Sequence, residues 1–410
     1  MTISTLDVAV IGAGPYGLSV AAHAIAEGLE VQVFGRPMHA WNKHMPVGMM
    51  LKSEPAASRL ADPRSAFTLN AYCELNDLPC AYGLPIPVER FVDYGRWFQA
   101  NTSAGSAVDD DVTEVRSEGG RFVLTLSTGE SVRARTVVMA LGFLPFARFP
   151  AGLAGLPSAL VTHSSQVNDL AEYTGQEVAI IGAGQSAIET ACLIKEAGGV
   201  PHLVVRAKSL EWNAVPRRDR ASIARLFAPE SGLGMGLRSW LWSERPGLVP
   251  HLPAAFRRRI VRTTLGPAGA WWLRERFEGV SVRPATRLTH STTRDGVMLS
   301  LLGGSAEVST LRADRVIAAT GYAVDVRRMR VLEPSLREAV EHVRRAPKLS
   351  STFESTVPGL FMVGLAAAPT FGPVMRFVHG AGFAARSTTR GLVRAVRGSA
   401  KAAPVLVEQP

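Results

Sequence analysis

Cysteine is scarce in this chain of 410 residues, which contains three: Cys73, Cys80 and Cys192. No two of them form a Cys-x-x-Cys pair, and their odd number argues against a disulfide scaffold. A disulfide reductase is nearly excluded, because that chemistry uses two closely spaced redox cysteines. A reducing cytoplasm is therefore the expected location of the protein.

Long apolar runs are also missing, since no stretch of about 18 uncharged apolar residues suggests a membrane span. The apolar start of the chain, from Val8 to Ile25, is interrupted by glycines and follows Asp7 rather than a basic leader. We interpret this segment as a buried strand and helix, and we expect a soluble protein with no membrane partner.

Acidic residues are outnumbered by basic ones, 35 against 45, which gives a formal net charge of +10. Such a charge alone raises the possibility of a nucleic-acid partner. Residues 211–276 hold twelve arginines and five acidic residues, so most of the excess charge belongs to one segment. No helix-turn-helix, zinc-ligand or RNA-binding signature accompanies it, and we expect no nucleic-acid partner.

A glycine-rich turn follows the first apolar strand, Val8 to Ile11. Gly12, Gly14 and Gly17 have the spacing GxGxxG before a predicted helix. In a Rossmann fold these glycines permit a tight turn, the approach of a pyrophosphate, and close packing of helix and strand. A second apolar strand, residues 31–34, follows at the right distance, so the segment predicts a dinucleotide site.

The end of that second strand lacks the acidic residue that usually binds the ribose, and reads Phe34-Gly35-Arg36 instead. Arg36 can stack on the adenine or meet a phosphate, or it can be a surface arginine.

The same pattern recurs later in the chain. A predicted strand, residues 177–181, precedes Gly182 and Gly184, and a helix from Ser186 and a strand to Val205 follow. Ala187 stands at the third position, which the fingerprint allows. Arg206 and Lys208 then replace the acid that would select NAD. Basic groups there favour NADP, or they can be charges that face solvent.

Two further apolar strands, residues 137–142 and 316–322, end in small-residue turns and are interpreted as the two crossings between domains. The sequence therefore predicts an α/β fold with two Rossmann-like dinucleotide-binding domains, the second inserted into the first, and a helical basic insertion. Residues 1–155 and 323–410 would form the FAD-binding domain. Residues 156–322 would form the NAD(P)-binding domain, which includes 211–276.

Over most of its length, the chain resembles the class B flavin-dependent monooxygenases. The segments GAGPYG and GAGQSA carry the likeness, as does the run from Asp314 to Tyr322, which is close to the D-x-x-x-[LF]-A-T-G-Y pattern of N-hydroxylating members. Ala318 departs from that pattern. The fingerprint of flavin-containing monooxygenases survives only as His163, with Pro157 and Ala159 at its Phe and Gly positions, which moves the chain away from xenobiotic oxygenases and Baeyer-Villiger enzymes.

Several short segments are also similar to bacterial enzymes described as FAD-dependent urate hydroxylases, namely residues 41–49, 51–53, 266–272 and 371–377. The resemblance implies that NAD(P)H reduces FAD and that dioxygen attacks the reduced flavin. One oxygen atom then passes from the flavin hydroperoxide to a nucleophilic substrate atom. We expect a small nitrogen-containing substrate, either a purine-like heterocycle or an amine. The alternatives are an NAD(P)H oxidase, an electron-transferring flavoprotein reductase and a non-catalytic nucleotide sensor.

The candidate catalytic residues are Lys52, Phe371 and Arg376, and no metal site is expected. Lys52 can lie near the flavin ring, bind a substrate carboxylate or face solvent, and the aromatics of residues 371–377 can equally be core. The candidate cofactor-binding residues are Gly12, Gly14, Pro15, Gly17, Arg36, Trp41, His44, Met49, Gly142, Gly182, Gly184, Gln185, Ser186, Arg206, Thr320, Gly321, Tyr322, Gly364 and Phe377.

Five of the seven tryptophans lie in the basic insertion: Trp212, Trp240, Trp242, Trp271 and Trp272. This enrichment fits a lid over a substrate pocket or the interface of a homo-oligomer.

Overall fold

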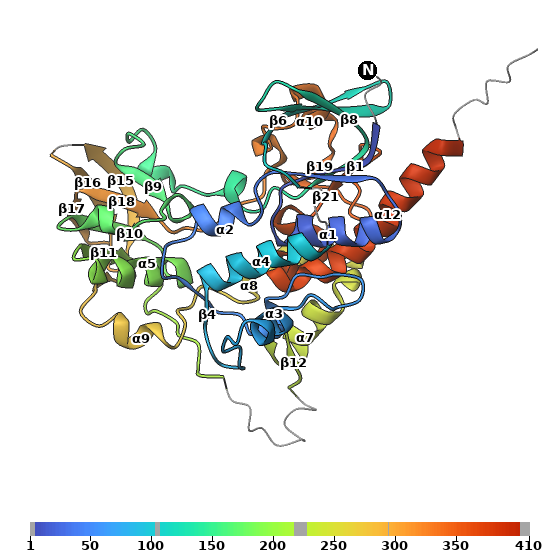
Figure 1. Ribbon diagram of the computed structural model, residues 1–410. Coiled ribbons are helices and arrows are strands. Elements are labelled where there is room, and N and C mark those ends of the chain that lie inside the picture. Colours follow the sequence, from blue (N-terminus) through green and yellow to red (C-terminus); the bar gives the residue numbers. More distant parts are fainter. Residues whose placement is uncertain (1–4, 103–106, 217–227, 294, 402–410) are drawn as a thin grey trace, which may run out of the picture.

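The computed structural model describes residues 5–102, 107–216, 228–293 and 295–401. Two sheets built around parallel strands form separate parts of the chain, with helices packed against them (Figure 1). This arrangement confirms the predicted α/β class with two Rossmann-type units. The predicted domain boundaries stay a prediction, and residues 217–227 of the basic insertion lie outside the described residues.

The first sheet has the order β5-β2-β1-β8-β7-β6, and β21 also pairs with β8. Its central strand β1 runs parallel to β2 on one side and to β8 on the other. Its residues from Val8 to Ile11 are buried, as is typical of a parallel sheet that is covered on both faces. The strands are β1 (Thr5–Ile11), β2 (Val31–Phe34), β5 (Ala107–Val108), β6 (Val112–Glu118), β7 (Arg121–Leu126), β8 (Ser131–Met139) and β21 (Leu360–Met362).

Helix α1 (Pro15–Ala26) packs beside the long C-terminal helix α12 (Ala381–Lys401), and α4 (Val88–Thr102) also contacts α1 (Figure 1). Helix α1 begins at Pro15, inside the glycine motif that was expected to precede it. Pro15 explains the early start, since proline has the fixed φ and missing N–H that suit a first helical position.

The second sheet is parallel and has the order β14-β11-β10-β18-β9. Helices α5 (Gln185–Glu196) and α9 (Leu273–Arg276) pack together beside it, and an antiparallel sheet of β15, β16 and β17 adjoins it. The strands are β9 (Val161–His163), β10 (Glu177–Ile181), β11 (Val200–Val204), β14 (Ser281–Arg283), β15 (Arg287–Thr293), β16 (Val297–Leu302), β17 (Val308–Ala313) and β18 (Arg315–Ala318).

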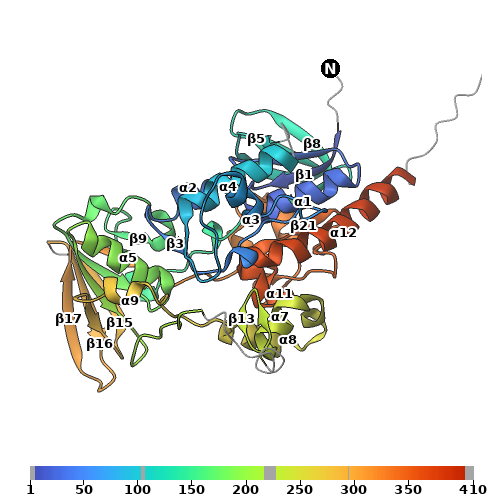
Figure 2. The same ribbon diagram turned by 60° about the horizontal axis from the view of Figure 1, so that its bottom comes forward.

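The basic insertion contributes β12 (Glu230–Ser231), β13 (Gly234–Met235), α7 (Leu237–Glu244), η6 (Pro246–His251) and α8 (Ala254–Thr263). These elements pack on α11 (Ala368–Phe371) and η9 (Pro373–Arg376), which follow the last strand of the first sheet. Figure 2 shows α7, α8 and β13 below α11, apart from the second sheet. The insertion therefore connects the two sheet-containing parts of the molecule.

The remaining elements are short turns of helix and two-residue strands. They are α2 (His39–Lys43), β3 (Met50–Leu51), η1 (Pro55–Ala57), α3 (Leu69–Leu75), β4 (Ile86–Pro87), η2 (Leu144–Phe146), η3 (Ala151–Leu153), η4 (Ser164–Gln166), η5 (Ala171–Tyr173), η7 (Val326–Arg328), α10 (Pro334–Ala339), β19 (His342–Val343), β20 (Ala346–Pro347), η8 (Gly364–Ala367) and η10 (Val378–Gly380). Among the described residues, no helix has both the length and the apolar character needed to cross a bilayer.

Candidate functional site

The first glycine turn joins β1 to α1 and has little room for side chains. Gly12 has a φ of +109°, and a Cβ atom there would lie 2.4 Å from the carbonyl oxygen of Ala140. A Cβ at Gly17 would lie 1.9 Å from the carbonyl oxygen of Gly12. At Gly14, the residue preceding α1, a Cβ would meet no atom within 4 Å, and no side chain caps the helix. The first amides of α1 are thus open to a phosphate group.

The second glycine turn joins β10 to α5 with the same geometry. A Cβ at Gly182 would lie 2.3 Å from the carbonyl oxygen of Ala319, the first residue after β18. Helix α5 follows Gly184, again without a side-chain cap, and Gln185 is its first residue. Ala187 fits the close contact of strand and helix, since it is fully buried. The second turn can therefore also take a phosphate at a helix N-terminus.

The two arginines that follow the second strand of each unit lie in different surroundings. Arg36 forms ion pairs with Asp109, at 3.6 Å, and with Asp111, at 3.4 Å, and all three side chains are exposed. Arg206 instead lines the large cavity next to the second turn. Its position leaves its guanidinium available for a bound ligand.

A cavity of about 2740 Å³ lies between the two sheet-containing parts of the chain. Ordinary small-molecule pockets measure roughly 300 to 1,000 Å³, so this cavity has room for more than one large ligand. It brings together many of the predicted site residues, which are Trp41, Met49, Lys52, Gly182, Gly184, Gln185, Ser186, Arg206, Thr320, Gly321, Tyr322, Arg376 and Phe377. The first turn, His44, Gly142, Gly364 and Phe371 are not part of its lining.

Lys52 lies at the junction of the first unit and the segment before α9. Its Nζ donates hydrogen bonds to Asn213 Oδ1 at 2.8 Å and to the carbonyl oxygen of Ala268 at 3.1 Å. Burial lowers the pKa of the Lys52 ammonium, and the nearby Glu189 opposes that effect. A cation with a lowered pKa beside a cavity is suited to pair with an anionic group.

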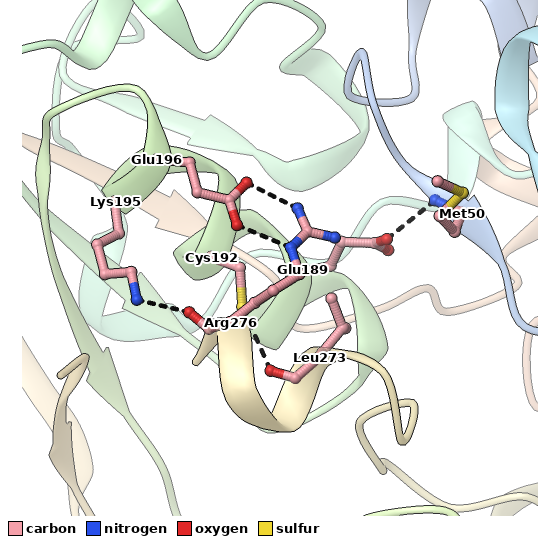
Figure 3. A network of polar contacts seen from close by, with 7 residues as sticks. All are labelled: Met50, Glu189, Cys192, Lys195, Glu196, Leu273 and Arg276. Atoms are coloured by element: carbon pink, nitrogen blue, oxygen red, sulfur yellow. Dashed lines mark hydrogen bonds and ion pairs between the residues drawn. The ribbon is translucent and has the colours of Figure 1, made fainter. Parts of the chain in front are cut away.

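Glu189 is a functional candidate that the sequence analysis did not identify. It is 2% exposed in the middle of α5, and its carboxylate accepts hydrogen bonds from the Met50 N–H at 3.0 Å and from Gln185 Nε2 at 3.2 Å. Burial raises the pKa of this carboxyl to about 7. Figure 3 shows Glu189 reaching from α5 to Met50. The available signal was an acidic residue among the apolar core positions of the predicted helix.

The crossing at residues 320–322 is fixed by contacts from Arg148 and from His163 at the end of β9. Arg148 Nη2 donates to the carbonyl oxygen of Thr320 at 3.0 Å, and His163 Nε2 lies 3.2 Å from that of Gly321. The Tyr322 ring packs against His163, with ring centroids 5.2 Å apart. Burial raises the pKa of Tyr322 to about 12 and lowers that of His163, so both are neutral at neutral pH. These groups set the position of one cavity wall.

The aromatic segment 371–377 is divided between core and cavity. Phe371 is 1% exposed and stacks on Phe353, with centroids 3.9 Å apart, so core packing accounts for it and it cannot meet a substrate from there. Arg376 lines the cavity, and its Nη1 donates to the carbonyl oxygens of Val261 at 2.9 Å and Thr264 at 3.2 Å. Arg376 therefore joins α8 of the insertion to the site.

Tyr16, in the first glycine motif, connects α1 to the same segment. Its hydroxyl donates to the carbonyl oxygen of Phe377 at 2.7 Å, and its ring lies 3.5 Å from the Cβ position of Gly364. Gly364 has a φ of +71°, a left-handed conformation that favours glycine. The sequence motif thus predicted the turn but not this contact.

The segment before β3 is held by packing as well as by hydrogen bonds. The Trp41 ring meets Phe91 edge to face at 4.7 Å, and His44 Nδ1 lies 2.9 Å from the carbonyl oxygen of Ser165. The carbonyl oxygen of Met49 accepts the Val88 N–H at 3.0 Å. Trp41 and Met49 reach the cavity, whereas His44 joins this segment to η4.

Three tryptophans of the insertion line the cavity: Trp240, Trp271 and Trp272. Trp271 and Trp272 pack edge to face, with centroids 5.6 Å apart. Trp212 packs against Phe277 in the core of the second unit. The aromatic enrichment is therefore shared between the cavity wall and ordinary packing.

Residues 4–230 match the family described as L-lysine 6-monooxygenase/L-ornithine 5-monooxygenase, over more than half of the chain. The chain belongs to this family. The match confirms the resemblance to the N-hydroxylating flavin-dependent monooxygenases that the two glycine motifs and the ATGY run suggested.

Solved structures show the same fold. Ornithine hydroxylase (PvdA) from Pseudomonas aeruginosa is 21% identical, with a TM-score of 0.73 over 96% of this chain and 100% of that one. L-lysine 6-monooxygenase from Pseudomonas syringae is 17% identical, with a TM-score of 0.70 over 95% of this chain and 100% of that one.

Among curated proteins, indole-3-pyruvate monooxygenase YUCCA1 of Oryza sativa subsp. japonica is 26% identical over 243 residues. That alignment covers 57% of this chain and 53% of the relative. The chain thus spans about half the length of this curated relative.

Proposed function

We propose that this protein is an FAD- and NADPH-dependent monooxygenase that hydroxylates the amine nitrogen of a small molecule. The observation that carries the proposal is the pair of open glycine turns in a member of this monooxygenase family, the second of which lines one large cavity. An enzyme that uses two dinucleotides must bring their reactive rings together in one space. The cavity between the two units supports that use.

The residues at the first turn fit FAD. The space that a Cβ would fill at Gly14 is empty, and the uncapped start of α1 offers backbone N–H groups to a pyrophosphate. When bound, FAD would supply the redox chemistry that activates dioxygen. The protein would orient the flavin ring with the segment that contains Phe377. The hydrogen bond from the Tyr16 hydroxyl to the carbonyl oxygen of Phe377 holds this segment on α1.

The residues at the second turn fit NADPH. Gly184 and Gln185 would hold the pyrophosphate, and Arg206 would pair with the 2′-phosphate. A charge-assisted pair of this kind contributes on the order of 1.5 to 3 kcal/mol.

Lys52, Asn213 and Arg376 are the polar groups that we assign to the substrate. An amine is reactive toward an electrophilic oxygen only when it is neutral, so the site should favour the unprotonated form. A cationic Lys52 near the substrate does so, because like charges disfavour the ammonium. It would also attract a carboxylate on the same substrate. Ornithine and lysine, which name the family, carry both groups.

We also propose that the enzyme works in the reducing cytoplasm and uses dioxygen as cosubstrate. The three free cysteines support the first point. The family membership supports the second.

The deciding experiment measures NADPH oxidation, oxygen uptake, peroxide release and hydroxylamine formation by the purified flavoprotein. The panel contains ornithine, lysine, cadaverine, a purine and a cyclic ketone. We expect one amine to raise NADPH oxidation, to suppress peroxide release and to incorporate an oxygen isotope from dioxygen. Stoichiometric peroxide with every compound would instead support an NADPH oxidase, and incorporation into the purine alone would favour the heterocycle.

A further inference from the structure

One loop of the first unit is held at both ends by the two dinucleotide-binding helices. We name residues 50–61 the strap. At its far end the Ala61 N–H donates to Ser19 Oγ of α1 at 3.0 Å. At its near end the Met50 N–H donates to Glu189 of α5 at 3.0 Å. Ser19 and Glu189 are 0% and 2% exposed, so the helix side of each contact is buried, and each hydrogen bond is partly buried.

The two helix residues occupy equivalent positions. Ser19 is the seventh residue after Gly12, and Glu189 is the seventh after Gly182. The hydroxyl of Ser19 is neutral at every accessible pH, whereas the carboxyl of Glu189 can gain or lose a proton. Only the contact between the strap and the NADPH side therefore depends on a titratable group.

Lys52 lies two residues beyond the Glu189 contact, and its own hydrogen bonds go to Asn213 and Ala268. Gln185 extends the same network, because its side-chain oxygen accepts the Ala270 N–H at 2.7 Å. Glu189 and Gln185 thus fix the strap and the segment 268–270 onto one helix.

We propose that Glu189 is a positioning residue that holds the Met50–Lys52 end of the strap on α5 and thereby keeps the Lys52 ammonium in place for an anionic group of the substrate. The inference rests on the proposed function for the identity of the ligand, but not for the structural contact. Glu189 itself needs no contact with the substrate.

The groups facing the Glu189 carboxylate come from the strap, from α9 and from α5 itself. They are Lys52 on the strap, Arg276 at the end of α9, and Gln185 and Cys192 on α5. Figure 3 draws Arg276 and Cys192 beside Glu189. Burial raises the pKa of Glu189 to about 7, while the two cations and the hydrogen bonds from Met50 and Gln185 lower it. Burial also raises the pKa of Cys192 to about 11, so its thiol is neutral near pH 7. The carboxylate is therefore the group that changes charge in this pH range.

The first test is hydrogen exchange of the flavin-loaded protein, which needs no turnover. We expect E189A to speed amide exchange in residues 48–53 by about tenfold, because the Met50 N–H loses its acceptor. The matched control is E196Q, on the same helix, whose carboxylate pairs with Arg276 and does not touch the strap. Unchanged exchange in E189A, or equal acceleration in E196Q, would overturn the proposal.

The second test compares E189Q with the wild type on the amine that is turned over, because glutamine keeps the acceptor but not the charge. We expect the ratio of KM values, variant over wild type, to be near one below pH 6 and to rise about fivefold above pH 8, with kcat and the rate of flavin reduction by NADPH little changed. A KM ratio that is independent of pH would contradict the proposal. A loss in the rate of flavin reduction by NADPH as large as the change in KM would contradict it as well. If no amine is turned over while E189A still loosens the strap, the proposed function fails and the positioning contact stands.

Discussion

The two dinucleotide-binding turns share a geometry and differ in what surrounds them. In each, the first glycine faces a backbone carbonyl of the crossing strand, Ala140 for Gly12 and Ala319 for Gly182. In the first unit, Arg36 follows the second strand and forms ion pairs with Asp109 and Asp111. In the second unit, the equivalent Arg206 lines the cavity. The backbone geometry thus serves any pyrophosphate, and the side chains around it decide which coenzyme is bound and how it is exchanged.

The helices behind the turns differ in the same way. Ser19 gives α1 a neutral partner for the strap, and Glu189 gives α5 a partner that titrates near pH 7. The comparison predicts that changes in the first turn remove flavin, whereas changes in the second turn affect reduction, pH response and coenzyme choice.

The largest expected effect is that of G14V in the first turn. A Cβ at Gly14 meets no protein atom within 4 Å and its φ of −88° suits valine, so the fold should survive while the pyrophosphate loses its space. We expect nearly complete loss of flavin, measured as visible absorbance per folded protein, with an unchanged far-ultraviolet dichroism spectrum. G398A, at a site with equally open space in α12, is the control. Full flavin content in folded G14V would show that the pyrophosphate lies elsewhere.

The equivalent change in the second turn, G184V, sharpens the comparison. A Cβ at Gly184 lies 3.6 Å from Pro267, which is ordinary contact, so the protein itself should tolerate a larger residue. We expect normal flavin content but flavin reduction by NADPH that is roughly hundredfold slower at a fixed low coenzyme concentration, a loss of about 3 kcal/mol in binding. Anaerobic stopped-flow absorbance measures this rate. Loss of flavin in G184V would instead indicate that the second turn binds FAD and the first binds NADPH.

A smaller effect is expected in the pH dependence of stability. The folded-state pKa of Glu189, about 7, lies above its ordinary value of 4.5, so the folded protein binds the proton more tightly than the unfolded chain. The contribution of Glu189 to stability should therefore be lost as pH rises from about 4.5 to about 7, by up to about 3 kcal/mol, and E189Q should lack this part of the pH dependence. Urea unfolding of both proteins at pH 5 and pH 8 measures the difference.

Glu196, on the same helix, should change stability with pH in the opposite direction to Glu189. Its hydrogen bonds from Arg276 lower its pKa, so its contribution to stability is present at neutral pH and is lost as pH falls. E196Q should therefore differ most from the wild type at pH 8, in the destabilising direction. Parallel pH profiles for wild type, E189Q and E196Q would show that neither carboxyl titrates abnormally.

The sequence was sufficient for features that depend on neighbouring residues. Gly12, Gly17 and Gly182 could be assigned because the turn they form is local and leaves no room for a side chain. Features that depend on distant packing could not be predicted. Glu189 meets Met50 across 139 positions of sequence, and Arg376 meets Thr264 across 112.

Phe371 illustrates the same limit. Phe371 lies in the same short segment as Phe377, which lines the cavity, so the sequence alone fits either a site residue or a core residue. The stacking of Phe371 on Phe353 assigns it to the core. Arg36 and Arg206 are another such pair. Both follow a second strand in the sequence, and only the position of Asp109 and Asp111 distinguishes them.

The preference between the two coenzymes tests that last pair directly. R206A should reduce the preference for NADPH over NADH by roughly tenfold to hundredfold, because it removes a charge-assisted pair with the 2′-phosphate. R36A should leave the preference unchanged, since the Arg36 guanidinium is already paired with Asp109 and Asp111 on an exposed surface, where such pairs contribute roughly 1 kcal/mol or less. The measurement is the affinity and the rate of flavin reduction with each coenzyme in both variants. If R36A and R206A reduced the preference for NADPH over NADH equally, each arginine would act through the overall positive charge of the protein and not through a direct contact. If R206A left the preference unchanged, another cation of the cavity, such as Arg287, would bind the 2′-phosphate.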